Sequence, residues 1–172
     1  MIETVRLLLR PPTPQQLLAL MDEPGRVLSL AGFPVAPGLR EFYVSGEVSP
    51  QWIARLRTLT DADPWTLGFA VIDRETQTAV GTAGFKGAAD ADGVVEVAYG
   101  IVPSFQGRGY ATEVTQALMD FARADPAVRR LRAHTLPTPN ASTRVLTKCG
   151  FAHLGEVVDP EDGLVWRWER TI

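Results

Sequence analysis

The stretch VEVAYGIVPSFQGRGYATE, at residues 95–113, constrains the fold of this chain more than any other. Its first half is almost continuously apolar, which is typical of a central β-strand, and Pro103 ends that strand. Gly107 and Gly109 follow, and an amphipathic helix is expected over residues 108–123. Because the first turn of such a helix presents free N–H groups to an anion, the segment predicts a phosphate-binding loop. The alternative is that the two glycines only form a tight turn.

Two common phosphate loops do not fit this segment. A P-loop requires GxxxxGK[ST], and the sequence contains no such run. A dinucleotide loop requires GxGxxG, but Gly107-x-Gly109 continues to Thr112 instead of a third glycine. The expected order of strands and helices also differs from that of a doubly wound sheet.

Hydrophobic periodicity along the chain predicts one mixed α/β domain spanning residues 1–172. The expected strands cover residues 2–10, 65–73, 79–85, 94–102, 131–135, 151–158 and 164–170. The first expected helix starts at a capping box formed by Thr13 and Gln16 and stops at Pro24-Gly25. The second runs from Ser49-Pro50 to about Thr60, and the third covers residues 108–123. The fourth runs from an N-cap at Asn140 to Cys149, with Gly150 as its C-cap. Residues 25–48 are expected to be irregular, because glycines and prolines recur there.

Composition excludes several classes of protein. Lys and Arg number 17 against 20 Asp and Glu, so the net charge of −3 does not favour nucleic-acid binding. No run of 18 apolar residues could span a membrane, and Glu3 and Arg6 interrupt any signal-peptide core. A single cysteine and two histidines favour neither a disulfide nor a metal site. We therefore expect a soluble, cytoplasmic protein with no metal, nucleic-acid or membrane partner.

Two signatures give the chain a resemblance to a known family. Gln106-x-x-Gly109-x-Ala111 matches [QR]xxGx[GA], the acyl-CoA pyrophosphate loop of the GNAT N-acetyltransferases. TLPTPNASTRVLTKCGF, at residues 135–151, is similar to the second signature of that family. VRLLLRPPTPQQL, at residues 5–17, resembles the opening of the branch that includes ribosomal-protein N-acetyltransferases.

This resemblance covers about residues 3–168 and implies both a fold and an activity. The implied fold is a mixed, mostly antiparallel central sheet of about seven strands with about four flanking helices. The implied reaction is the transfer of an acetyl group from acetyl-CoA to a primary amine by direct attack on the thioester. Residues 22–60 depart most from the family pattern, and this region usually shapes the acceptor pocket.

The resemblance also assigns residues to acetyl-CoA, which would lie between two splayed strands at 94–102 and 131–135. Its pantetheine would pair with backbone groups near Ile101 and Val102, and Val102 could polarise the thioester carbonyl. Its pyrophosphate would contact Gln106, Gly107, Arg108, Gly109, Tyr110, Ala111 and Thr112. The residues expected to flank the pantetheine or adenosine are Asn140, Ser142 and Arg144. Arg108 could equally be a solvated charge, and Asn140 a plain N-cap.

Glu96 is the candidate general base, because the attacking amine must lose a proton. On simple alternation it shares a face with Ala98 and Gly100, whose small side chains leave room nearby. The alternative is an exposed or ion-paired strand glutamate. Glu113 lies inside the following helix, so we interpret it as structural.

The family often uses a tyrosine after the second signature to protonate the leaving thiolate. The three tyrosines of this chain, Tyr43, Tyr99 and Tyr110, all lie upstream, so Ser142 is the positional substitute. The alternatives are that Ser142 only begins a helix, and that the thiolate leaves unassisted.

Other conspicuous side chains are interpreted as packing residues: Cys149, His134, His153 and the tryptophans, with Phe33 and Trp52 as possible pocket walls. The acceptor is not evident from the sequence and could be a protein N-terminus, an amino sugar, a polyamine or another small amine. A non-catalytic acyl-CoA-binding module and an unrelated phosphate-loop protein remain competing hypotheses. The C-terminal hairpin could offer an edge strand to a homodimer.

Overall fold

An eight-stranded sheet crosses the molecule in the order β1-β2-β5-β6-β7-β8-β10-β9. The computed structural model describes residues 1–23, 29–46, 48–160 and 162–172. The sheet strands are β1 (Ile2–Glu3), β2 (Leu7–Arg10), β5 (Phe69–Asp73), β6 (Thr78–Phe85), β7 (Val94–Ile101), β8 (Arg130–Thr135), β9 (Ala152–Asp159) and β10 (Gly163–Thr171). Neighbouring strands are antiparallel except β7 and β8, which are parallel. A separate small sheet pairs β3 (Ser29–Leu30) with β4 (Phe33–Pro34).

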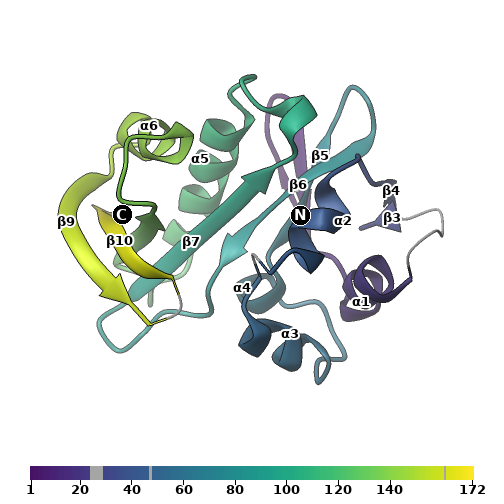
Figure 1. Cartoon of the computed structure of the whole chain (residues 1–172), viewed down its shortest axis with the longest axis horizontal. Helices are drawn as coiled ribbons and strands as arrows, with labels where there is room; N and C mark the ends of the chain where they lie inside the picture. Colours follow the sequence, from purple (N-terminus) through teal and green to yellow (C-terminus); the bar gives the residue numbers. More distant parts are fainter. Residues whose placement is uncertain (24–28, 47, 161) are drawn as a thin grey trace.

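The helices cover both faces of this sheet. They are α1 (Pro14–Asp22), α2 (Leu39–Val44), α3 (Pro50–Leu56), α4 (Pro64–Leu67), α5 (Tyr110–Arg123) and α6 (Ala141–Lys148), with a 3₁₀ turn at Pro103–Phe105. α5 packs on β7, β2 and α6, whereas α2 and α4 pack on β6. Figure 1 shows α1–α4 at one end of the molecule and the β9–β10 hairpin at the other. This is the expected mixed, mostly antiparallel architecture, with one more strand and two more helices than predicted.

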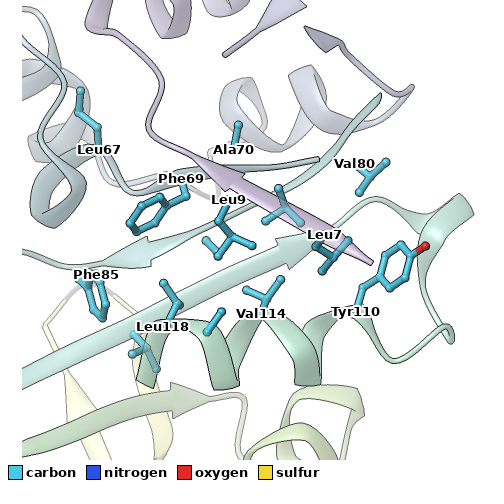
Figure 2. Packing of buried hydrophobic residues seen from close by; sticks show 14 of the residues in the cluster. Leu7, Leu9, Leu67, Phe69, Ala70, Val80, Phe85, Tyr110, Val114 and Leu118 are labelled. Atoms are coloured by element: carbon cyan, nitrogen blue, oxygen red, sulfur yellow. The ribbon is translucent and has the colours of Figure 1, made fainter. Parts of the chain in front are cut away.

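The core lies between the sheet and α5. Leu7 and Leu9 of β2 and Val114 and Leu118 of α5 are completely buried, and Figure 2 shows them facing one another. Burying each of these aliphatic side chains contributes roughly 1.5–3 kcal/mol. Tyr110 lies at the end of the same row, so the core fixes the start of α5 relative to the strands.

The predicted strand over residues 2–10 is wrong, because a turn divides it into the β1–β2 hairpin. Ile2 pairs with Leu9 across that hairpin. The Thr4 hydroxyl accepts from the Leu7 N–H at 3.0 Å, and the Thr4 N–H donates to the Leu7 carbonyl at 2.9 Å. Threonine competes in this way with a strand ladder by bonding nearby backbone.

The first half of the predicted strand 65–73 is instead the short helix α4. The Asp63 side chain accepts from the Trp65 N–H at 3.0 Å and so caps this helix. Gly68 ends it with a φ of +66°, a conformation that favours glycine. Alternation alone cannot detect a single helical turn before a strand.

Two predictions for residues 25–60 differ from the structure: the stretch expected to be irregular contains regular elements, and the helix after Ser49 is shorter than expected. The supposedly irregular stretch contains β3, β4 and α2. The helix that starts after the Ser49 cap ends at Leu56 and not near Thr60. The predicted stop at Pro24-Gly25 lies outside the described residues.

The predicted capping box at Thr13 and the predicted N-cap at Asn140 are both confirmed. Thr13 and Gln16 bond reciprocally at α1. Asn140 and Thr143 form the same reciprocal bonds at the start of α6. Cys149 is the C-cap of this helix, and Gly150 follows it with a φ of +76°.

β9 forms a free edge of the sheet, with Leu154 and Val158 exposed on it. Its use in a homodimer stays a prediction. Across the part of the chain that the structure describes, no helix has the length and apolar character needed to cross a membrane.

Candidate active site

β7 and β8 separate where the sequence predicted two splayed strands. Their parallel pairing runs from Val94↔Arg130 to Glu96↔Arg132. Beyond that point β7 stays paired only with β6, as far as Ile101, and β8 continues beside β10. The carboxyl half of β7 therefore has one edge that no described strand covers.

The direction of the backbone groups along β7 follows from two hydrogen bonds. The Lys86 N–H donates to the Glu96 carbonyl and the Val102 N–H donates to the Val80 carbonyl, both at 2.9 Å. Because backbone direction alternates along a strand, Tyr99 and Ile101 direct their polar groups to the uncovered edge. Of the two residues expected to bind pantetheine, Ile101 has the required direction, whereas the N–H of Val102 is already bonded.

The helix α5 begins without a side-chain cap. Gly109, with a φ of +81°, is its N-cap, and the first helical bond runs from the Glu113 N–H to the Gly109 carbonyl at 3.1 Å. The N–H groups of Tyr110, Ala111 and Thr112 therefore have no acceptor within the helix. Gly107 adopts a φ of +75°, and the position of its absent Cβ faces open space. This is the geometry in which backbone N–H groups can surround an anion.

Two polar side chains of the loop bond to the backbone beside it. Gln106 Nε2 donates to the Ile101 carbonyl at 2.8 Å, which ties the loop to the end of β7. Arg108 donates to the Ser104 carbonyl at 3.1 Å and lies 4.5 Å from the ring centroid of Phe105. Arg108 is exposed, so its charge adds to the positive potential at the start of α5.

Arg6 is a part of this site that sequence reasoning missed. Its guanidinium donates to the Arg108 carbonyl at 2.7 Å and forms an ion pair with Glu113 at 2.7 Å. Glu113 also accepts from the Thr4 hydroxyl at 2.6 Å. Burial raises the pKa of Glu113, but the bonds from Thr4 and Arg6 outweigh burial and lower it. The turn between β1 and β2 is thereby fastened to the loop, and Glu113 is structural as interpreted.

The side chain of Tyr110 faces the core rather than a ligand. It is buried and donates a short hydrogen bond to Asp73 at the end of β5. That bond raises the pKa of Tyr110. Burial raises the pKa of Asp73, but the bonds from Tyr110 and Thr76 outweigh it and lower the pKa. Only the backbone of Tyr110 is therefore available to the loop.

The three residues of the second signature that were expected to flank acetyl-CoA, Asn140, Ser142 and Arg144, lie in the first turn and a half of α6. The Asn140 side chain accepts from the Thr143 N–H at 3.0 Å and donates to the Thr138 carbonyl at 3.1 Å. The amide oxygen thus serves as the plain N-cap, and the amide nitrogen bonds to the preceding loop. Ser142 is half-buried and Arg144 is exposed.

Tyr99 lies across from Ser142, although its position in the sequence gave no reason to expect this. Its hydroxyl is buried and, among the described residues, has no hydrogen-bond partner of normal geometry. Burial raises the pKa of Tyr99 to about 12, and the nearby hydroxyls of Ser142 and Thr115 oppose part of this rise. A tyrosine from β7 therefore lies beside Ser142, the residue expected to substitute for the missing downstream tyrosine.

Glu96 is ion-paired, which was the alternative to a free catalytic carboxylate. Its Oε1 lies 2.8 Å from Lys86 Nζ and 3.2 Å from His134 Nδ1, and its side chain keeps 19% exposure. His134 Nε2 accepts from Arg167 Nε at 3.4 Å. Burial lowers the pKa of Lys86, but the bond and charge of Glu96 outweigh this and raise it. His134, interpreted as isolated, is thus a neighbour of the candidate base.

A cleft of about 520 Å³ opens on the face of the sheet that carries Glu96. Its described lining residues come from α2, α3, α4 and the segments after them, and from β6 and β7. Trp52 is one of its walls, whereas Phe33 is not among the described lining residues. A smaller hollow of about 290 Å³ lies beside it and includes Gly100, Ile101 and Gln106. Among the described residues, no three His, Cys, Asp or Glu side chains are placed to hold a metal ion.

Separating parallel strands, a QxxGxA loop and an uncapped helix together define the acyl-CoA-binding class of α/β acetyltransferases. The chain belongs to the GNAT acetyltransferase domain family, whose model matches residues 6–152. It is 29% identical over 93 residues to an uncharacterized N-acetyltransferase, p20, from Bacillus licheniformis, covering 54% of this chain and 52% of that protein. It is 30% identical over 82 residues to the uncharacterized N-acetyltransferase YoaA from Bacillus subtilis, covering 48% and 46%. The chain spans about half the length of these curated relatives.

Solved structures share the fold over nearly the whole chain. A GNAT-family acetyltransferase from Bacillus anthracis matches with a TM-score of 0.63 and 19% identity, covering 99% of this chain and 96% of that one. RimL, a ribosomal L7/L12 alpha-N-protein acetyltransferase in complex with coenzyme A, matches with a TM-score of 0.63 and 18% identity, covering 98% and 96%. At these identities the likeness concerns the fold alone.

Proposed function

We propose that this protein transfers an acetyl group from acetyl-CoA to a primary amine. The observation that carries the proposal is the uncapped start of α5, in a QxxGxA loop, beside the uncovered edge of β7. The family assignment supports it, as does the coenzyme A named in the RimL complex.

In this proposal the pyrophosphate accepts hydrogen bonds from the N–H groups between Gly107 and Thr112. Gly107 and Gly109 allow the backbone to approach it closely, and Arg108 adds a positive charge. Pantetheine pairs with the backbone of Tyr99 and Ile101 as an added strand would. Asn140 and Arg144 approach the ligand from the start of α6, with Asn140 offering backbone only.

The chemistry begins when a neutral amine attacks the carbonyl carbon of the thioester. Glu96 takes the proton of the amine, directly or through one water, and the C–S bond then breaks. The Ser142 hydroxyl gives a proton to the departing thiolate and regains one from solvent, with the Tyr99 hydroxyl beside it. Lys86 holds the carboxylate of Glu96 in place, and His134 Nδ1 lies 3.2 Å from the same oxygen.

The donor site is tested by calorimetric titration with acetyl-CoA, with CoA and ATP as comparison ligands. The variant Ala111→Pro removes one free N–H at the second helical position, where proline is tolerated and no helical bond is lost. We expect its acetyl-CoA affinity to fall at least about tenfold, the value of a hydrogen bond to a charged group. The control is Gln15→Pro, at the same exposed position of α1. Equal affinity in wild type and a folded Ala111→Pro protein would contradict the proposed loop.

The competing function is an acyl-CoA-binding module without turnover, and the ion pair of Glu96 favours it. Binding of acetyl-CoA without thiol release, across a broad panel of amines, would support that module. Thiol release with any amine would exclude the binding module and support the transferase.

A further inference from the structure

Aromatic rings form walls of the 520 Å³ cleft, and the polar atoms of Tyr43 and Trp52 are bonded within the protein. Phe42, Tyr43 and Trp52 line it, whereas the ring of Phe85 packs on Phe121 on the other face of the sheet. Trp52 donates through Nε1 to the Thr66 carbonyl at 2.6 Å, so the indole offers the cleft its apolar surface. The Tyr43 hydroxyl likewise donates to Thr82 at 2.9 Å, and its ring stacks on Trp52 with centroids 6.1 Å apart. Walls of this kind bind an apolar or aromatic body.

The charges in the cleft are positive. The described lining residues include Arg55 and Lys86 but no Asp or Glu. Lys86 is engaged with Glu96 at 2.8 Å and with Asp162 at 3.6 Å. Arg55 is exposed, and among the residues that the structure describes no carboxylate pairs with it. A guanidinium left open beside aromatic walls is suited to bind a carboxylate through two hydrogen bonds.

The cleft also reaches the proposed base. Ala98 lines it and shares a strand face with Glu96, two residues earlier on β7. Lys86 belongs to the lining and holds the Glu96 carboxylate. A molecule in the cleft can therefore bring an amine to this end while its remaining groups contact the aromatic walls and Arg55.

We propose that this cleft is the acceptor pocket and that it selects an amino-acid-like molecule: a primary amine on an apolar, aromatic-sized body that also carries a carboxylate. This inference rests on the proposed transferase function. A polyamine or an amino sugar carries several ammonium groups and would need carboxylates, whereas the described lining contains no Asp or Glu and presents the guanidinium of Arg55.

The test measures thiol release from acetyl-CoA with three acceptors. L-Phenylalanine has a phenyl ring, a primary amine and a carboxylate. Phenethylamine has the same ring and amine but no carboxylate, and spermidine is a polycation. We expect kcat/KM for L-phenylalanine to exceed that of phenethylamine by about tenfold, the value of one charge-assisted contact. Spermidine should be the poorest substrate.

Arg55→Met tests the contact itself. Arg55 is exposed in α3, so the variant should fold. We expect it to lose about tenfold in kcat/KM for L-phenylalanine and much less for phenethylamine, which has no carboxylate to lose a contact. The control is Arg57→Met, because Arg57 caps the same helix, pairs with Asp22 at 3.2 Å and is outside the described lining.

Failure of this inference is distinguishable from failure of the proposed function. The proposed acceptor class is wrong if phenethylamine or spermidine is a better substrate than L-phenylalanine, or if Arg55→Met keeps the preference for L-phenylalanine over phenethylamine. In either case the proposed transferase activity is still supported. If acetyl-CoA binds but none of the three releases thiol, the acceptor class is overturned while the donor site remains. If acetyl-CoA does not bind to the folded protein, the proposed function itself fails.

Discussion

At the scale of single residues, the surroundings of Glu96 determine which roles its carboxylate can take. Lys86 and His134 both approach Oε1, at 2.8 and 3.2 Å, so this oxygen is committed to the protein. Among the described residues no hydrogen bond or ion pair involves Oε2, so this oxygen is the one that can meet a substrate or a water molecule. A carboxylate held by one oxygen is well positioned for proton transfer by the other, because its orientation needs no further ordering.

The first residue-scale prediction concerns Glu96→Gln. We expect the rate of thiol release to fall by about 10²–10⁴-fold, the usual contribution of a general base. Acetyl-CoA affinity should stay unchanged, because Glu96 lies on the acceptor face. The measurements are steady-state turnover with the best amine and calorimetric binding of acetyl-CoA. Glu75→Gln, an exposed carboxylate in the turn between β5 and β6, is the control. Wild-type turnover in Glu96→Gln across the whole pH range would exclude Glu96 as the base.

At the scale of elements, the helix starts differ in how their N–H groups are used. α1 and α6 close their first turns with capping boxes. α5 begins at a left-handed glycine with no side-chain bond. A side chain that caps a helix competes with a ligand for the same donors, so the donors of α5 are the ones left open.

The element-scale prediction follows for Asn140. Asn140→Ala removes the cap and should cost about 1 kcal/mol of folding free energy. Asn140→Asp keeps the acceptor for the Thr143 N–H and should retain most of that stability. Both variants should bind acetyl-CoA as the wild type does, because the amide already bonds within the protein. Urea titration gives the stability and calorimetry the affinity. A large loss of affinity in the stable Asn140→Asp protein would show that the amide contacts the ligand.

At the scale of the whole molecule, three carboxylates join parts of the chain that are distant in sequence. Glu113 fastens α5 to the N-terminal hairpin, and Asp73 joins β5 to Tyr110. Glu169 of β10 pairs with Arg132 and Arg130 of β8, at 2.7 and 3.1 Å. For Glu169, burial raises the pKa, but these arginines outweigh it and lower the pKa. All three groups therefore have lower pKa values in the folded protein than in the unfolded chain.

Stability should consequently fall in acid. A lowered pKa means that the unfolded chain binds more protons, so the stabilisation is present above the ordinary carboxyl values of 3.8 and 4.5 and is lost as pH falls through the folded values. Glu113 and Glu169 should each contribute on the order of 1 kcal/mol, after allowance for the partly exposed arginines. Urea titrations from neutral pH down to about pH 3 measure this slope. Glu113→Gln and Glu169→Gln should each flatten it, and a slope unaffected by either change would contradict the assignment.

The sequence by itself determined the features that depend on contacts within a few residues. The QxxGxA loop at residues 106–111, the capping box at Thr13, the N-cap at Asn140 and the apolar strand from Val94 were all evident without the fold. A cap or a tight turn is decided by neighbouring backbone and side-chain groups, so a local pattern is sufficient evidence for it. Glycine at positive φ is likewise a local requirement.

Only the tertiary structure decided which of these residues meet. Arg6 and Glu113 are 107 positions apart, and His134 reaches Glu96 only because β7 and β8 pair in parallel up to that point. The bonded N–H of Val102 depends on the register of β6, and the cleft depends on how α2, α3 and α4 lie over the sheet. Hydrophobic burial fixes these arrangements through the sum of many contacts, and no short stretch of sequence contains that sum.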